Sequence, residues 1–107
     1  MNPFEFFDLF DTFEWDDGNL QKNIVLHDVS PFECEEIFFN FPVLIKFDQK
    51  HSQAEKRYFA LGRTDRNRFL FVGVVLRNRK VRVITGRDMN KKEVRIYEDN
   101  KKRNSPV

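Results

Sequence analysis

An unbroken apolar run covers residues 69–76 (FLFVGVVL). Such a run predicts a strand that is buried on both faces of a sheet. The next stretch, residues 80–86, alternates between apolar and polar positions, which predicts a strand with two different faces. One face would carry Val81, Val83 and Thr85, and the other Lys80, Arg82 and Ile84.

Shorter apolar patterns predict further strands. They cover residues 57–63, Val43–Phe47 and, as a candidate edge strand, Thr12–Trp15. Asp65-Arg66-Asn67 and Asn78-Arg79 have the composition of hairpin turns. The three strands that these turns connect are therefore expected to pair antiparallel.

Capping residues mark the helix starts, because their side chains satisfy free N–H groups of the first turn. A short helix is expected from Asn2-Pro3, and it would pack through Phe4, Phe7 and Phe10. A second helix is expected over Asn19–His27, and a third would start at Ser30, with Glu33 closing its capping box, and end near Asn40. Asn90 and Glu93 would open the last helix. The pattern predicts an α+β fold: an antiparallel β-sheet with two N-terminal helices and a C-terminal helix. Residues 99–107 are polar and are expected to form a frayed tail.

Composition places the chain among globular single domains. It has 107 residues, and thirteen Phe supply material for a core. No apolar run is long enough for a transmembrane helix, and the acidic, aromatic N-terminus does not resemble a secretory signal. The one cysteine, Cys34, cannot form an internal disulfide and is expected in the core. These features favour a cytoplasmic protein.

Charge is divided unevenly along the chain. Residues 1–50 carry three Lys against eleven acidic residues, a net charge of −8, and residues 51–107 carry sixteen Lys and Arg against six, a net charge of +10. This asymmetry suggests a surface that binds a polyanion or attracts an oppositely charged protein. Charges that only solvate the surface are the alternative.

Candidate chemistry is restricted to side chains that can act on phosphate. Four scattered glycines form no phosphate loop, and two histidines with one cysteine are poor material for a zinc site, so no cofactor is expected. RNA cleavage without metal needs a proton acceptor, a cation near the phosphate and a proton donor. Arginines on a rigid sheet would supply the cation, and His27, a lysine or Tyr97 the proton transfer. Tyr58 and Phe59 are available for base stacking.

Each of these residues also has a structural interpretation. His27 would complement a helix dipole, Tyr97 would be a core residue with its hydroxyl at the rim, and Arg57 and Arg82 would pair with carboxylates across the sheet. Residue types alone do not decide between the two interpretations.

The order and spacing of several short motifs resemble the BrnT family of toxins. They are Phe13 to Asp16 (FEWD), Asn23 and His27, Val29-Ser30 with Phe32-Glu33, Arg57-Tyr58 with Gly62-Arg63-Thr64, Val81 to Arg87 (VRVITGR), and Lys92-Glu93 with Tyr97. The resemblance divides the chain into an N-terminal extension (residues 1–12), a toxin domain (13–98) and a flexible tail (99–107).

The resemblance implies a compact α+β domain similar to RelE-type toxins. It implies metal-independent endonucleolytic RNA cleavage that inhibits translation and growth, and neutralisation by a BrnA-type antitoxin. DNA would be contacted only indirectly, through the antitoxin, and no membrane would be involved. The candidate catalytic residues are then His27, Arg57, Arg82, Arg87, Glu93 and Tyr97. Basic residues expected to bind RNA are Lys22, Arg63, Lys80, Lys91, Lys92 and Arg95.

The chain departs from the family pattern near His27. Asn19 stands where the family usually has a lysine, and Leu26-His27-Asp28 replaces a usual Lys-His-Gly. The loss of two lysines supports an alternative: a catalytically inactive toxin-fold module that binds RNA or an antitoxin-like partner. A DNA-binding regulator that acts alone is a weaker third hypothesis, because no helix-turn-helix pattern is present and the basic residues lie largely on predicted strands.

Overall fold

The computed structural model describes residues 1–103, without the side chains of residues 22–26. Its elements are α1 (Pro3–Phe7), β1 (Thr12–Glu14), α2 (Asp17–His27), α3 (Pro31–Glu36), β2 (Leu44–Phe47), the 3-10 turn η1 (Gln49–His51), β3 (Lys56–Arg63), β4 (Phe69–Arg77), β5 (Lys80–Asp88) and α4 (Lys91–Arg103). The predicted α+β class is therefore confirmed.

The five strands form one sheet in the order β1-β5-β4-β3-β2. Strands β2 to β5 pair antiparallel, as predicted. The β3–β4 and β4–β5 connections are tight turns in which Asn67, Asn78 and Arg79 have positive φ. The three-residue β1 adds a parallel edge beside β5, so the sheet is mixed and not wholly antiparallel. Three helices precede β2: the two N-terminal helices of the predicted fold, and the short helix predicted to start at Asn2-Pro3, which is confirmed as α1.

Helix starts follow the predicted caps. The Asn2 side chain accepts a hydrogen bond from the Phe4 N–H, and Ser30 with Glu33 forms a complete capping box. The helix that Ser30 opens is shorter than predicted, since α3 ends at Glu36 and turn residues follow. At the other end of the chain α4 continues through Arg103, into the segment expected to be a frayed tail.

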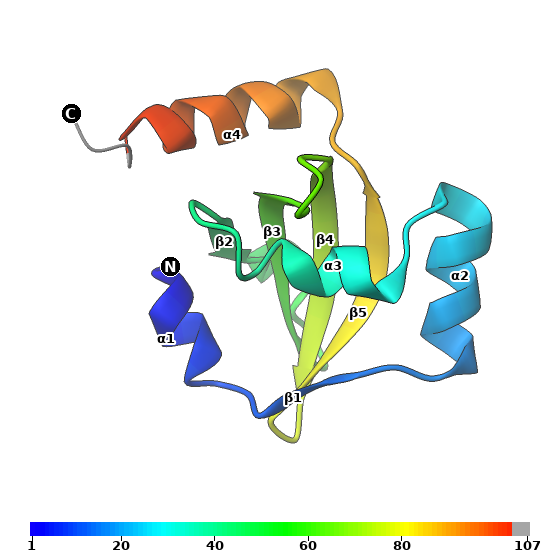
Figure 1. Ribbon diagram of the computed structural model, residues 1–107. Coiled ribbons are helices and arrows are strands. Elements are labelled where there is room, and N and C mark those ends of the chain that lie inside the picture. The colour runs from blue at the N-terminus through cyan, green and yellow to red at the C-terminus, as the bar shows by residue number, and fades with distance from the viewer. Residues whose placement is uncertain (104–107) are drawn as a thin grey trace.

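The inner face of the sheet carries the core. In Figure 1, α3 crosses in front of β4 and β5, α1 lies to one side, and α2 flanks the β5 edge. Buried strand residues on this face are Ile45, Tyr58, Ala60, Leu70, Val72, Val74, Val81 and Val83, and they pack with Val29, Cys34, Ile37 and Phe38 from the α2–α3 connection, α3 and the turn after it. Cys34 is thus a core residue, as expected.

The segment before β1 contributes to this core in an unexpected way. Phe6 is fully buried, and its ring stacks on Phe38 at 5.7 Å and meets Tyr58 edge-on at 5.2 Å. The predicted packing face of Phe4, Phe7 and Phe10 is wrong in part, because Phe4 is 64% exposed. The five-residue helix turns Phe6 toward α3 and the sheet, and Phe7 and Phe10 only border the core.

A β-bulge in β5 changes which residues share a face. The β4–β5 register passes from Gly73 opposite Thr85 to Val74 opposite Val83, which leaves Ile84 as an extra residue. Thr85 was predicted to share a face with Val81 and Val83, but the bulge moves it to the opposite, outer face. It also places Arg82 and Arg87 on that same outer face, although five residues separate them and strict alternation would have put them on opposite faces.

Candidate nucleic-acid interface

The outer face of the sheet gathers three of the predicted site arginines in adjacent rows. Arg57, Val75 and Arg82 form one row across β3, β4 and β5. Phe59, Gly73 and Thr85 form the next, followed by Leu61, Phe71 and Arg87. Because paired residues project from the same side of a sheet, Arg57, Arg82 and Arg87 share one surface.

Two aromatic rings lie between these cations. Phe59 and Phe71 stack at 5.7 Å with an interplanar angle of 18°, and both are half-buried. The Arg87 guanidinium carbon lies 4.2 Å from the centre of the Phe71 ring. Tyr58, predicted to stack on bases with Phe59, points instead into the core and is 6% exposed, because neighbouring strand residues alternate between faces.

Arg82 is held by carboxylates of the N-terminal segment. Its guanidinium nitrogens lie 2.7 and 2.9 Å from the two Asp16 oxygens and 3.4 Å from a Glu14 oxygen. Asp16 also caps α2 by accepting hydrogen bonds from the Gly18 and Asn19 N–H groups. The hydrogen bond from Arg82 is the main reason that the pKa of Asp16 falls from 3.8 to about 2.

Arg87 is held by Glu93 at the start of α4. Two guanidinium nitrogens donate to the two Glu93 oxygens at 2.8 and 2.9 Å, a bidentate pair. Glu93 also closes the predicted capping box with Asn90. Burial acts to raise the pKa of Glu93, but the hydrogen bonds from Arg87 and from the Asn90 N–H lower it overall.

Arg57 differs from these two arginines. Within the part of the chain that the structure describes, its guanidinium has neither a hydrogen bond nor an ion pair. It lines a shallow groove of about 160 Å³ together with His51, Phe59, Phe71 and Thr85. Gly73 contributes to the floor of this groove, where the absence of a side chain leaves space.

Lysines border the same aromatic pair on the side of α4. A second hollow, of about 340 Å³, is lined by Lys46, Lys92, Phe59, Phe71 and Glu93 among others. Lys92 was predicted as an RNA-binding residue. Lys46 was not, although its place opposite Phe59 follows from the β2–β3 register.

The remaining predicted RNA-binding residues are distributed more widely. Lys80, Lys91 and Arg95 are exposed on β5 and α4. The side chain of Lys22 lies outside the described residues.

His27 lies away from the Arg57 groove, at the end of α2 beside Asp88, whose pKa is lowered mainly by the hydrogen bonds from Arg68. The nearby Arg68, which was not among the site residues predicted from the sequence, organises this corner. It donates to the carbonyl oxygens of His27 and Asp28 and to the carboxylates of Glu33 and Asp88. No local motif marks Arg68, because its partners are distant in the sequence.

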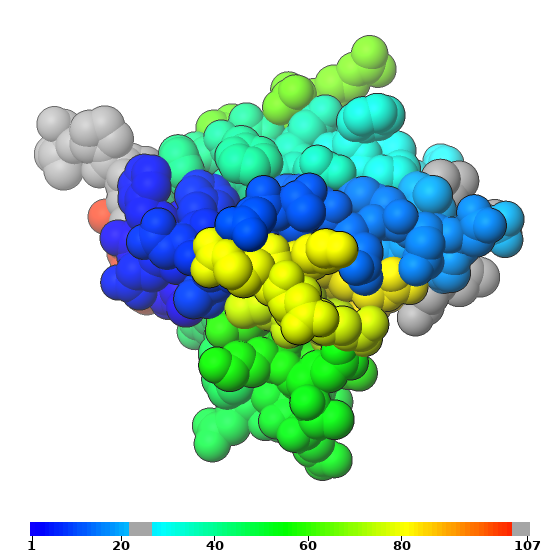
Figure 2. All heavy atoms as spheres, turned by 90° about the horizontal axis from the view of Figure 1, so that it is seen from below, coloured from blue at the N-terminus to red at the C-terminus, as the bar shows by residue number. Residues whose placement is uncertain are grey.

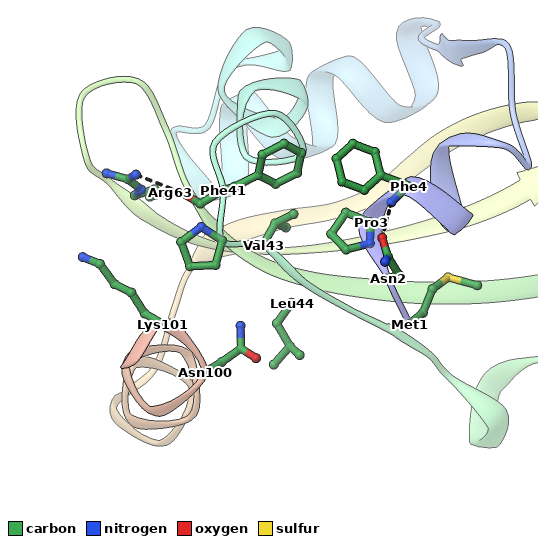
Figure 3. A pocket seen from close by; sticks show the side chains of 11 residues that line it. Met1, Asn2, Pro3, Phe4, Phe41, Val43, Leu44, Arg63, Asn100 and Lys101 are labelled. Atoms are coloured by element: carbon green, nitrogen blue, oxygen red, sulfur yellow. Dashed lines mark hydrogen bonds between the residues drawn. The ribbon is translucent and has the colours of Figure 1, made fainter. Parts of the chain in front are cut away.

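Tyr97 and Arg63 belong to another part of the molecule. Tyr97 is fully buried, packs edge-on against Phe69 and donates a 2.8 Å hydrogen bond to the Pro42 carbonyl oxygen, and burial raises the pKa of its hydroxyl. Arg63 donates to the Phe41 carbonyl oxygen at 3.1 Å. Figure 3 shows Arg63 beside a cavity of about 680 Å³ between the start of α1, residues 41–44 and α4.

The described part of the chain holds neither a metal-binding cluster nor a membrane-spanning helix. No group of three or more His, Cys, Asp or Glu residues in it could hold a metal ion. None of its helices is long and apolar enough to cross a membrane.

A family model matches most of the chain. The model of the family described as the ribonuclease toxin BrnT of type II toxin–antitoxin systems matches residues 15–93, which include the outer-face arginines and Glu93. No curated protein matches the chain significantly. The matched segment covers most of the chain, and the chain therefore belongs to the BrnT family of ribonuclease toxins.

Proposed function

We propose that this chain is the toxin of a type II toxin–antitoxin system, and that it cuts RNA on the outer face of its sheet without a metal ion. The observation that carries the proposal is the convergence of Arg57, Arg82 and Arg87 around the stacked rings of Phe59 and Phe71, in a member of a ribonuclease toxin family. The arrangement of helices on a largely antiparallel sheet suits a RelE-like fold.

Each element of this surface matches a need of RNA cleavage. Guanidinium groups stabilise the charge that develops on phosphate, and aromatic side chains on a sheet stack with unpaired bases. Arg57 offers a guanidinium without an ion-pair partner among the described residues. Arg82 and Arg87 are oriented by Asp16 and Glu93, and each retains N–H groups that these carboxylates do not use.

The roles of the other predicted residues follow from their positions. Glu93 orients Arg87, and Tyr97 supports α4 against Pro42. Lys46 and Lys92, which line the same hollow beside the aromatic pair, would bind the RNA backbone there. His27 lies near Asp88, and Arg68 holds the backbone of His27 by a hydrogen bond to its carbonyl oxygen.

The family also implies an antitoxin as protein partner. We propose an antitoxin of the BrnA type that neutralises the toxin and carries the contact with DNA. Inhibited translation and arrested growth would follow when the antitoxin is absent.

Induction in a bacterial host tests this function. We expect the chain to arrest growth, the neighbouring gene to relieve the arrest, and Arg57→Ala to abolish it. Arg79→Ala is the matched control, because it removes the same charge from the tip of the β4–β5 hairpin, where Arg79 pairs with Asp11. Continued growth after induction of the folded wild-type chain would contradict the toxin function.

One observation favours the alternative of an inactive binding module. Asn19 stands in the place of a usual family lysine and is 3% exposed. Its side chain donates hydrogen bonds to the carbonyl oxygens of Glu14 and of Val83, the residue before the bulge, so its role is structural. Purified protein that binds single-stranded RNA with a strong salt dependence but never cuts it would support this alternative.

A further inference from the structure

The connection between β2 and β3 contains a histidine–carboxylate pair. His51 Nδ1 lies 2.9 Å from Asp48 Oδ2. Asp48 directly precedes the η1 turn, and His51 is its last residue. An ionised carboxylate can only accept hydrogen bonds, so Nδ1 carries the proton in this pair. In the neutral imidazole the second ring nitrogen, Nε2, then carries the lone pair that can accept a proton.

Ser52 fixes this pair next to Arg57. Its hydroxyl donates to the Asp48 carbonyl oxygen at 2.6 Å and accepts from the Arg57 N–H at 2.9 Å. The Asp48 N–H in turn donates to the Arg57 carbonyl oxygen at 2.8 Å. The turn that carries His51 is therefore bound to Arg57, the strand residue whose side chain lines the groove.

His51 and Arg57 border the same two hollows. One is the groove floored by Gly73 between Phe59 and Thr85, and the other, of about 340 Å³, is lined by Lys50, Gln53 and Glu55. Figure 2 shows the β2–β3 connection, in green, projecting from the body beside the yellow tip of the β4–β5 hairpin. The imidazole is 57% exposed, so a bound nucleotide can reach it.

We propose that His51, oriented by Asp48, is the proton acceptor in RNA cleavage and that Arg57 holds the phosphate beside it. This inference rests on the proposed ribonuclease function and assigns a residue to it. Neither His51 nor Asp48 lies among the site residues expected from the sequence.

The step balances with water as the only co-reactant. Nε2 of His51 takes the proton of the 2′-hydroxyl, and the 2′-oxygen forms a bond to phosphorus. The bond between phosphorus and the 5′-oxygen breaks, and the leaving oxygen takes a proton from water. The hydroxide that remains takes the proton held on Nε2, which restores both the water and His51. The products are a 2′,3′-cyclic phosphate and a 5′-hydroxyl, while Arg57 balances the charge on the phosphate oxygens.

Cleavage of a short single-stranded RNA by purified variants tests this assignment. We expect His51→Ala to lower kcat by about 100-fold or more with little change in KM, because a general base acts in the transition state. Added imidazole should restore part of that rate. Asp48→Asn should lower kcat less and respond less to imidazole, since its histidine is still present.

Gln49→Ala is the matched control, because this exposed residue lies on the same turn and does not line either hollow. It should cut at the wild-type rate. Thermal unfolding of each variant verifies that the domain is folded.

The outcomes separate the two proposals. A folded His51→Ala variant that cuts as fast as an active wild-type protein would overturn the role of His51 and leave the ribonuclease function standing. A slow His51→Ala variant whose rate imidazole does not raise would also overturn that role. A wild-type protein that cuts no RNA would overturn both proposals.

Discussion

Asp16 connects two structures at the scale of single residues. Its carboxylate caps α2 and also holds the Arg82 guanidinium, which lies on the outer face of the sheet. One side chain therefore sets both where the helix begins and where a site cation points. The role of Asp16 as a cap could be predicted from its position before the helix, but the partnership with Arg82 could not, because 66 residues separate the two.

Asp16→Asn tests the ion pair separately from the cap, since asparagine is also a good capping residue. The pKa of Asp16 is lowered in the folded state to about 2. Its contribution to stability is therefore complete above its unfolded pKa and is lost as the pH falls from about 4 toward 2. We expect the urea midpoints of wild type and Asp16→Asn to differ at pH 6 and to converge near pH 2. A difference that is independent of pH would contradict the ion pair.

Arg68 is the residue whose loss should most disturb the corner around His27. Arg68→Ala would leave the carboxylates of Glu33 and Asp88 without their shared cation, at a cost of about 1–3 kcal/mol. Arg79→Ala, which removes an exposed ion pair that solvent screens, should cost clearly less than Arg68→Ala. Urea unfolding measures both. Equal effects would show that Arg68 is only a surface residue.

At the scale of elements, the short helix α1 is part of the domain although it precedes the segment that matches the family. Phe6 places a fully buried ring between Phe38 and Tyr58, and the family match begins only at residue 15. The N-terminal chain, blue in Figure 2, runs beside the hairpin tip, where Asp11 pairs with Arg79. This extension therefore supplies core packing as well as a surface contact.

Two phenylalanines of the same helix offer a matched test of this packing. Phe6→Ala should lower the free energy of unfolding by about 3–5 kcal/mol, because it leaves a cavity in the core. Phe4→Ala, at a position 64% exposed, should change it by less than about 0.5 kcal/mol. Denaturant unfolding gives both values. A small effect of Phe6→Ala would show that α1 is not docked as described.

The elements themselves could largely be predicted from the sequence, because alternation, caps and turn residues are local signals. Ser30 with Glu33 and the Asn78-Arg79 turn are examples. The bulge at Ile84 could not, since an extra residue is defined only by pairing with β4. That bulge decides whether Arg82 and Arg87 lie on the same face and can act together. The sequence therefore indicated the site arginines but could not show that they share a face.

At the scale of the whole molecule, the acidic and basic halves of the chain neutralise each other in part. Arg68, Arg79 and Arg82 of the basic half pair with Glu33, Asp11 and Asp16 of the acidic half. The charge asymmetry of the sequence therefore contributes to folding as well as to the surface. Two hollows border the aromatic pair on the outer face. One is lined by Arg57, and the other by Lys46 and Lys92.

RNA binding should depend on these remaining cations. We expect the affinity for a labelled single-stranded RNA to fall with rising salt, and Arg57→Ala to reduce the slope of log K against log salt by about 0.7, the value for one phosphate contact. Fluorescence anisotropy over a range of KCl concentrations measures the slope. Arg79→Ala should leave it unchanged, and an equal slope for Arg57→Ala would remove Arg57 from the RNA surface.

The most direct measurement is cleavage of a single-stranded RNA by the purified chain in the presence of a metal chelator, with the product ends identified. We predict cutting that leaves 2′,3′-cyclic phosphate ends, and a loss of rate of at least about 100-fold in Arg57→Ala but not in Arg79→Ala. A folded wild-type chain that leaves the RNA intact, or an Arg57→Ala variant that cuts at the wild-type rate, would contradict an active site on the outer face of the sheet.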